Sequence, residues 1–226
     1  MSAQEFYMQR CLNLAKKGIG NVSPNPMVGS VIVCNNEIIG EGFHQKSGYP
    51  HAEAEAIASV KDKGLLSNST LYVNLEPCAH FGKTPPCSDL IIRHKIPKVV
   101  VGCLDTSSKV SGKGIQNMQN AGLEVIVGVL EDESRKINKN FFVFHEKRRP
   151  YIILKWAESI DGFIAPHNQA GSFWMTSSAS KILTHKWRAE EDAILVGRVT
   201  ADKDNPLLTV REVNGNNPIR LVIDKK

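Results

Sequence analysis

The chain has 226 residues, of which 42% are hydrophobic and 23% charged, and its formal net charge is +5 at pH 7. This ordinary composition excludes low-complexity and disordered classes. No apolar run is long enough to cross a bilayer, and residues 1–10 lack the apolar core of a secretion signal. Five cysteines at irregular spacing do not make a disulfide framework, so we expect a cytoplasmic protein.

The clearest charge cluster is Lys147-Arg148-Arg149, which lies directly before Pro150. Short charge runs are usually solvated, so we interpret this one as a domain junction rather than a nucleic-acid arm. We expect neither nucleic acid nor membrane as a partner, and the sequence leaves a homo-oligomer open.

The first part of the chain alternates between strand and helix after an initial hairpin. Two β-branched runs around Cys34-Asn35-Asn36-Glu37 predict that hairpin. The expected elements, in chain order, are a helix ending near Gly18, strands 28–33 and 38–42, helix 51–60, strand 71–75, helix 88–94, strand 98–104, helix 114–121, strand 123–129 and helix 131–140. This order predicts a three-layer α/β domain with a mixed sheet over residues 1–149.

A second region begins at Pro150. Its pattern predicts a strand over 151–155 that pairs with 160–165, a helix over 177–188, and strands 193–196 and 219–223. About 75 residues are fewer than the roughly 100–150 of a typical α/β nucleotide-binding domain. We therefore expect residues 150–226 to form an incomplete α/β domain.

His51, Cys78 and Cys87 are the strongest chemical signal in the sequence. One imidazole and two thiolates suit Zn²⁺, and a site with three protein ligands keeps a fourth position for water, as catalytic zinc sites do. Cys87 follows two prolines at a predicted helix start, where the thiolate is favoured. Zinc would lower the pKa of water towards ~7, and a nearby carboxylate must then carry the proton.

Two carboxylates compete for that role. On a regular helix Glu55, four residues after His51, shares its face better than Glu53 does, because a turn takes about 3.6 residues. Glu53 can serve only if His51 lies at the helix cap with a backbone that is not yet helical. Pro50, directly before His51, favours that geometry.

Structural interpretations stand beside the catalytic ones. Cys103 could complete a closed structural zinc site, although such sites usually use tight paired spacings. Cys11, Cys34 and Cys103 lie in apolar segments and are typical of packing residues. Asn25, between two prolines, is also typical of a turn. The remaining histidines without a spacing pattern are expected at the surface or hydrogen-bonded: His94, His145, His167 and His185.

Several motifs carry a resemblance to a known family. The pattern H-x-E…P-C-x-x-C of zinc nucleobase deaminases is present with a longer final spacer. The segments are HAE at 51–53, PNPMVG at 24–29, CAHFGKTPPC at 78–87, GKG at 112–114, NAG at 120–122 and KWAESIDG at 155–162. Together they resemble the bacterial bifunctional riboflavin biosynthesis family RibD, over essentially the whole chain.

The resemblance implies a cytidine deaminase-like domain over 1–149 and part of a dihydrofolate-reductase-like α/β domain over 150–226. It implies zinc-dependent hydrolytic deamination of 2,5-diamino-6-ribosylamino-4(3H)-pyrimidinone 5′-phosphate to 5-amino-6-(5-phosphoribosylamino)uracil. The implied zinc ligands are His51, Cys78 and Cys87, and the implied proton shuttle is Glu53. The positions that match the family's substrate pocket are Asn25, His44, His80, Lys83 and Thr84.

For the second region the resemblance implies a reductase that uses NADPH to convert the ribosyl group to ribityl. The positions that match its NADP site are Ala157, Trp174, Thr200 and Asp204. The positions that match its ribose phosphate site are Ser172, Arg188, Leu208 and Arg211. Because the sequence stops soon after strand 219–223, we expect this region to be truncated and its reduction impaired.

Two other functions compete with this prediction. One is a deaminase of another base, nucleoside or tRNA; a tRNA editor would carry basic and aromatic residues around the zinc motif, whereas the neighbours of His51 include Gly48, Tyr49, Ala52 and Ala54. The other is a non-catalytic zinc-binding module, against which an intact Glu53 argues. Turnover with candidate pyrimidines would separate the three.

Overall fold

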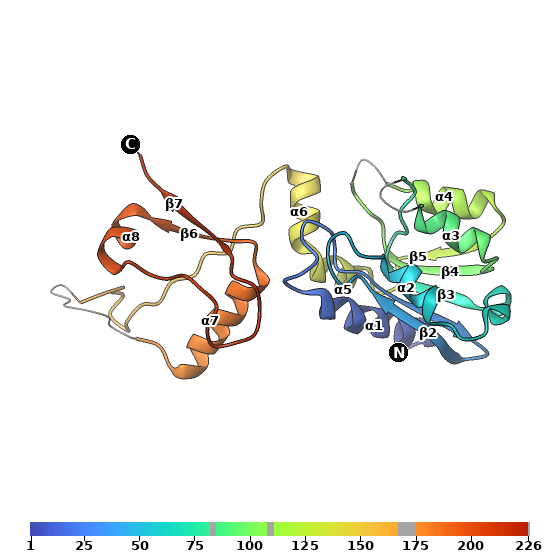
Figure 1. Cartoon of the computed structure of the whole chain (residues 1–226), viewed down its shortest axis with the longest axis horizontal. Coiled ribbons are helices and arrows are strands. Elements are labelled where there is room, and N and C mark those ends of the chain that lie inside the picture. Colours follow the sequence, from blue (N-terminus) through green and yellow to red (C-terminus); the bar gives the residue numbers. More distant parts are fainter. Residues whose placement is uncertain (82–84, 108–110, 167–174, 226) are drawn as a thin grey trace. The chain divides into compact units, whose positions relative to one another are not determined.

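The computed structural model describes residues 1–81, 85–107, 111–166 and 175–225. These residues form two compact units, Met1–Tyr151 and Ile152–Lys226, which we describe separately. Figure 1 labels their helices and strands. Among the described residues, no helix combines the length and apolarity needed to span a bilayer.

The first unit alternates strand and helix after an N-terminal helix and a hairpin. Its elements are α1 (Ala3–Ala15), 3-10 helix η1 (Lys16–Gly18), β1 (Gly29–Cys34), β2 (Glu37–Phe43), α2 (Ala52–Ser59), 3-10 helix η2 (Lys63–Asn68), β3 (Thr70–Leu75), α3 (Cys87–Arg93), β4 (Lys98–Cys103), α4 (Lys113–Asn120), β5 (Glu124–Val127), α5 (Glu131–Ile137) and α6 (Lys139–Lys147). Asn35 and Asn36 close the β1–β2 hairpin with φ of 50° and 64°, the left-handed pair that a two-residue hairpin turn requires.

The sheet of this unit is mixed, as the sequence predicted. Its strand order is β2-β1-β3-β4-β5. β1 pairs antiparallel with β2 and β3, whereas β3, β4 and β5 are parallel. The parallel half explains the continuous apolar runs of β3 and β4, because helices cover both faces of such strands.

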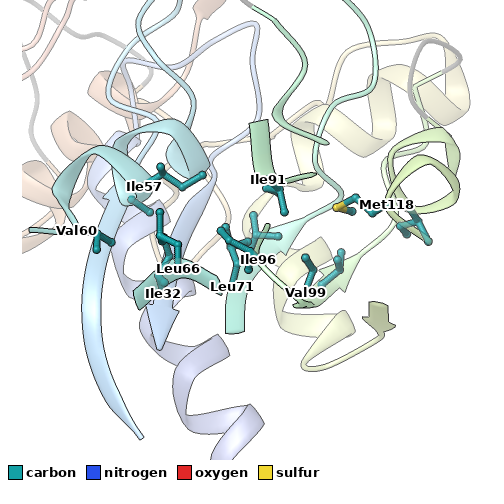
Figure 2. Packing of buried hydrophobic residues seen from close by; sticks show 13 residues of the cluster. Ile32, Ile57, Val60, Leu66, Leu71, Ile91, Ile96, Val99 and Met118 are labelled. Carbon is teal, nitrogen blue, oxygen red and sulfur yellow. The ribbon is translucent and has the colours of Figure 1, made fainter. Parts of the chain in front are cut away.

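Two apolar layers hold helices against the two faces of this sheet. On one face, Ile57 of α2, Ile91 of α3 and Met118 of α4 belong to one buried cluster with Ile32, Leu71 and Val99 of the strands (Figure 2). On the other face, α1 packs its apolar side against alternate residues of the same strands: Tyr7, Met8, Cys11 and Leu14 meet Val31, Val33, Tyr72 and Val100. Each fully buried aliphatic side chain contributes about 1.5–3 kcal/mol, so both helix layers are fixed relative to the sheet.

The predicted helix over 131–140 is wrong, because two helices stand there. α5 ends at Ile137, and Asn138 has φ −106° and ψ 23° before α6 begins at Lys139. The side chain of Asn138 hydrogen-bonds both backbone groups of Met27. That tertiary pairing favours a break which helical periodicity alone does not show.

The second unit contains less regular structure in its described part. α7 (Ser178–Glu190) and α8 (Arg198–Asp204) accompany a parallel pair of strands, β6 (Ala193–Gly197) and β7 (Ile219–Ile223). The strands predicted over 151–155 and 160–165 are wrong, since this stretch is irregular and turn-rich. Its backbone hydrogen bonds are local, from Ser159 to Phe163 and from Gly162 to Ser159, and therefore form turns rather than a ladder.

Candidate metal and catalytic centre

Three elements of the first unit bring His51, Cys78 and Cys87 together. His51 is the N-cap of α2, with an extended backbone at φ −76° and ψ 161°. Cys87 is the first residue of α3, directly behind Pro86. Cys78 lies three residues beyond Leu75, where β3 ends.

The separations between the ligand atoms match a tetrahedral zinc site. His51 Nδ1 lies 3.6 Å from Cys78 Sγ and 3.3 Å from Cys87 Sγ. Bonds of about 2.05 Å to nitrogen and 2.3 Å to sulfur place the two atoms about 3.5 Å apart at a tetrahedral angle. All three ligand atoms lie within 4.8 Å of one another. The donor set and its geometry therefore fit Zn²⁺, with a fourth position left for a small ligand.

Electrostatics favour a thiolate in this cluster. Hydrogen bonds from Cys87 and His51 lower the pKa of Cys78 to about 4. The backbone N–H of Cys87, at the start of α3, also donates to Cys78 Sγ at 3.3 Å. The hydrogen bond between His51 and Cys78 raises the pKa of His51 to about 9. The hydrogen bond between the two thiol groups raises the pKa of Cys87. Cys78 is thus the first thiol to ionise.

Glu53 is the carboxylate of this centre. Because His51 is not helical, Glu53 becomes the second residue of α2, and its side chain is buried and lines the same cavity as His51 and Cys78. Burial, reinforced by the negative charge of Cys78, raises the pKa of Glu53 to about 7. Glu55 is half-buried and is not among the described residues that line the cavity.

A polar chain leads from Pro50, the residue directly before His51, through His44 to Asn25. His44 Nδ1 lies 3.0 Å from the Pro50 carbonyl oxygen, which can only accept, so this nitrogen carries the proton. His44 Nε2 is then the acceptor for Asn25 Nδ2 at 3.0 Å. Burial lowers the pKa of His44, which keeps the ring neutral and this arrangement fixed. The Asn25 amide is therefore oriented with its oxygen as the remaining acceptor.

A cavity of about 470 Å³ joins these groups. Three residues that resemblance assigned to the substrate pocket, Asn25, His44 and His80, line it together with His51 and Glu53. Lys83 and Thr84, the other two, lie outside the described residues. The volume is in the range of sites that hold a drug-sized molecule.

The sequence reading missed several residues that line this cavity. Asp105 and Ser107 follow β4, and four side chains come from α6 and its C-cap: Phe141, Phe144, His145 and Arg148. The solvated-junction interpretation of 147–149 is therefore incomplete, as is the expectation that His145 is merely a surface or hydrogen-bonded histidine. The signal was available for Asp105, because a polar residue directly after a buried parallel strand lies at the sheet edge where sites form.

Glu76 binds the backbone of the loop that carries Asp105. Its buried carboxylate accepts hydrogen bonds from the backbone N–H groups of Asp105, Gly112 and Gly114 at 3.2, 3.0 and 3.0 Å. It lies two residues before Cys78. One side chain therefore ties the zinc-ligand segment to the residues that form the cavity wall.

The alternative with Cys103 as a fourth ligand is not supported. Cys103 Sγ donates to the Asn74 carbonyl oxygen at 3.4 Å, and burial raises the pKa of the thiol to about 12. Cys11 and Cys103 belong to apolar clusters, in agreement with their interpretation as packing residues. His185 is buried and its Nδ1 accepts from the Arg211 backbone N–H, whereas His167 lies outside the described residues.

In the second unit, three expected ribose phosphate residues gather around Thr209. Arg188 Nη1 donates to the Thr209 carbonyl oxygen at 2.7 Å, and Arg211 Nη1 donates to Thr209 Oγ1 at 2.9 Å. Leu208 is the adjacent residue, with φ 54°. Burial and the positive charge of Arg211 lower the pKa of Arg188. Ser172 lies outside the described residues.

The expected NADP positions are less closely grouped. Thr200 and Asp204 lie on α8, four residues apart and so on one side of that helix. Ala157 lies on the irregular segment that follows Tyr151, and Trp174 is outside the described residues. The assignment of these four residues to a cofactor stays a prediction.

Comparison with known proteins agrees with both units. Residues 1–103 match the family model described as the cytidine and deoxycytidylate deaminase zinc-binding region, and residues 150–226 match the RibD C-terminal domain. The first unit is thus similar to the zinc-binding region of cytidine and deoxycytidylate deaminases, and the second unit to the RibD C-terminal domain.

Relatives narrow this class further. The chain is 48% identical over 219 residues to the riboflavin biosynthesis protein RibD of Aquifex aeolicus, covering 96% of this chain and 61% of that protein. It is 45% identical over 225 residues to RibD of Synechocystis, covering 100% of this chain and 60% of that protein. The chain is thus similar to RibD proteins over nearly its whole length.

Solved structures agree. A diaminohydroxyphosphoribosylaminopyrimidine deaminase/5-amino-6-(5-phosphoribosylamino)uracil reductase from Thermotoga maritima superposes with a TM-score of 0.92 at 47% identity, covering 99% of this chain and 64% of that one. RibD of Acinetobacter baumannii gives 0.90 at 38% identity, covering 99% of this chain and 64% of that one. The chain therefore spans about three fifths of the length of the relatives it matches.

Proposed function

We propose that the first unit is a zinc-dependent deaminase of riboflavin biosynthesis. Its substrate would be 2,5-diamino-6-ribosylamino-4(3H)-pyrimidinone 5′-phosphate, and its products 5-amino-6-(5-phosphoribosylamino)uracil and ammonia. The observation that carries this proposal is a buried carboxylate, Glu53, in one cavity with the zinc ligands His51 and Cys78. Similarity to RibD proteins over nearly the whole chain supports the choice of substrate.

The residues present would perform the reaction as follows. Zinc, when bound by His51, Cys78 and Cys87, supplies Lewis acidity that lowers the pKa of water towards ~7. Glu53 accepts the proton of the attacking water while oxygen adds to the ring carbon that bears the amino group. Glu53 then donates a proton to the amino nitrogen, the carbon–nitrogen bond breaks, and ammonia leaves. Burial raises the pKa of the Glu53 carboxyl, which favours a group that both accepts and donates a proton.

The substrate would be oriented by the polar groups of the cavity wall. Asn25, held by His44, presents an amide of fixed orientation. His80, Asp105 and Ser107 offer further polar contacts from loops that follow β3 and β4. We assign to Lys83 and Thr84, by resemblance alone, contacts to the substrate phosphate and its neighbourhood.

For the second unit we propose binding of the ribose phosphate group and of NADPH, which supplies hydride when bound. Arg188 Nε is buried and has no hydrogen-bond partner among the described residues. A bound phosphate would satisfy this atom and offset the repulsion between Arg188 and Arg211. Titration of ribose 5-phosphate should give binding that Arg211→Met weakens at least about tenfold, or about 1.4 kcal/mol.

The experiment that tests the deaminase is an anaerobic assay of the zinc-loaded chain. Ammonia release and product mass are followed with the diaminopyrimidine ribosyl phosphate, and in parallel with cytidine and deoxycytidylate. We expect turnover with the first and little with the other two. Deamination of cytidine alone would identify a different deaminase, and no turnover with any of them would favour a non-catalytic zinc module. A cytoplasmic location and a homo-oligomer remain predictions.

A further inference from the structure

Asn138 lies outside the zinc cluster and contacts the segment that carries Asn25. The Met27 backbone N–H donates to Asn138 Oδ1 at 2.7 Å, and Asn138 Nδ2 donates to the Met27 carbonyl oxygen at 2.9 Å. One carboxamide thus pairs with both polar groups of one residue, across 111 positions of sequence.

A second amide closes the same contact from the sheet side. Asn74 on β3 donates from Nδ2 to the Met27 carbonyl oxygen at 3.1 Å and accepts from the Gly29 backbone N–H at 2.7 Å. Both asparagines are buried, with exposed fractions of 0% for Asn74 and 3% for Asn138. Four hydrogen bonds therefore fix two backbone N–H groups and one carbonyl group of residues 27–29.

We call the four hydrogen bonds from Asn74 and Asn138 to residues 27–29 the clamp. The clamp matters because the segment before β1 has no regular structure of its own. Residues 21–28 consist of turns and irregular backbone. Outside these four hydrogen bonds, the backbone contacts of the segment include a turn from Asn25 N to the Val22 carbonyl oxygen at 2.8 Å, a bond from His44 N to the Val28 carbonyl oxygen at 2.9 Å and one from Ser47 N to the Asn21 carbonyl oxygen at 3.4 Å. Asn25 lies two residues from Met27 and reaches the cavity wall.

We infer that Asn138 is a positioning residue for the deaminase site: with Asn74 it holds the Met27 backbone and thereby places the Asn25 amide in the substrate cavity. This inference rests on the proposed function in so far as Asn25 contacts substrate. It assigns a role to the break between α5 and α6, because a continuous helix would not leave Asn138 in its observed backbone conformation. Only a carboxamide of this length offers a donor and an acceptor side by side.

The test uses the full chain with three single variants. Asn138→Leu removes both hydrogen bonds and keeps the same branched side-chain skeleton, and Asn138→Asp keeps the acceptor but loses the donor. Asn117→Leu, at an exposed position of α4, is the matched control. Hydrogen exchange of the zinc-loaded proteins is followed at Met27. In Asn138→Leu we expect exchange at Met27 to be at least about tenfold faster, with zinc content unchanged. The Phe142 amide, which bonds the Asn138 carbonyl oxygen, reports whether α6 stays folded.

Deaminase kinetics supply the second readout. Misplacing Asn25 should raise KM about tenfold or more in Asn138→Leu and Asn138→Asp and leave kcat within about threefold. A merely structural role would instead reduce the active fraction, so that kcat falls at constant KM. Asn117→Leu should match the wild type in both constants.

A double-mutant cycle decides whether Asn138 acts through Asn25. In an Asn25→Ala background, Asn138→Leu should change kcat/KM less than about twofold, because the two residues then form one unit. Unchanged exchange at Met27, unchanged KM, or fully additive losses would each overturn the inference. A wild-type chain without turnover would defeat the proposed function instead, and the exchange measurement, which uses no substrate, would still decide on the clamp.

Discussion

The carboxylate of Glu76 accepts a hydrogen bond from the backbone N–H of Gly114 at 3.0 Å, across 38 residues of sequence. Gly114 also lies so close to Pro77 that no side chain fits there, because a Cβ at Gly114 would stand 2.0 Å from the Pro77 carbonyl oxygen. Pro77 is bonded directly to Cys78, one of the three proposed zinc ligands. The start of α4 therefore sets the position of one ligand.

Gly114→Ala should weaken both folding and zinc binding. The clash is with backbone, which has to shift, and such overpacking costs about 1–3 kcal/mol of unfolding free energy. Urea denaturation and a chelator competition measure the two effects. Gly197→Ala is the control, because a Cβ there meets nothing within 4 Å. Wild-type zinc affinity in Gly114→Ala would show that the contact does not govern Cys78.

Glu76→Gln should loosen the loop that carries Asp105. The amide end of glutamine faces backbone N–H donors that then lack an acceptor, and each buried donor left unpaired costs about 1–3 kcal/mol. We expect a lower free energy of unfolding by denaturant and a higher deaminase KM. Glu124→Gln, which removes an exposed ion pair with Lys98, should change the free energy of unfolding by no more than about 0.5 kcal/mol. It should leave the KM unchanged. Equal effects in the two variants would refute the anchoring role.

Much of the first unit was predictable from local pattern. The hairpin, the alternation and the mixed sheet follow from period-two and helical patterns, and the candidate metal ligands follow from residue type. The break at Asn138 was not predictable, because its cause is a hydrogen bond to Met27 over 111 positions. The cavity residues of α6 were missed because their role also depends on contacts between distant parts of the chain. The charged and aromatic residues of this helix do not show by themselves that they line a cavity.

Strands of the second unit illustrate a different limit. Residues 151–155 carry a β-branched, apolar pattern, and the pattern predicted a strand. A strand exists only when a neighbour supplies the ladder, and the described residues around Ser159 and Gly162 make turn hydrogen bonds instead. The pattern of Ile219–Ile223 was equally apolar, and there β6 supplies the partner.

Zinc should bind with one equivalent per chain, and Cys78→Ser or Cys87→Ser should abolish it at micromolar concentration. Serine cannot supply the thiolate that makes the site strong. Metal analysis after gel filtration and turnover of the same samples measure both consequences. Cys103→Ser, a buried cysteine outside the cluster, should keep its zinc. Full metal content in both ligand variants would remove the assigned site.

The ion pair between Arg10 and Glu41 predicts a pH-dependent contribution to stability. It joins α1 to β2 through two bonds of 2.6 and 2.7 Å, and the hydrogen bond from Arg10 lowers the pKa of Glu41. A depressed pKa means that the stabilisation is present above the ordinary glutamate pKa of ~4.3 and is lost as the pH falls through the folded value. The pair is partly exposed, so it contributes at most about 1 kcal/mol.

Glu41→Gln should therefore lower the unfolding free energy at pH 7 by up to about 1 kcal/mol. This effect should become progressively smaller as the pH falls below about 4. High salt should also reduce the difference. Urea denaturation of wild type, Arg10→Met, Glu41→Gln and the double variant gives the coupling energy directly. A coupling that stays constant down to pH 2 would contradict the assignment of the pair as its source.

Glu53→Gln should keep zinc and lose deamination by ~10²–10⁴-fold, because glutamine cannot accept the proton of the attacking water. Glu55→Gln is the matched control two residues along α2 and should be close to wild type. The discrimination rests on the N-cap geometry of His51, whose extended backbone turns Glu53 rather than Glu55 towards the ligands. Metal content and kcat are measured on the same zinc-loaded samples. If Glu55→Gln were inactive and Glu53→Gln active, α2 would have to begin before His51 in solution, and the proton path proposed here would be wrong.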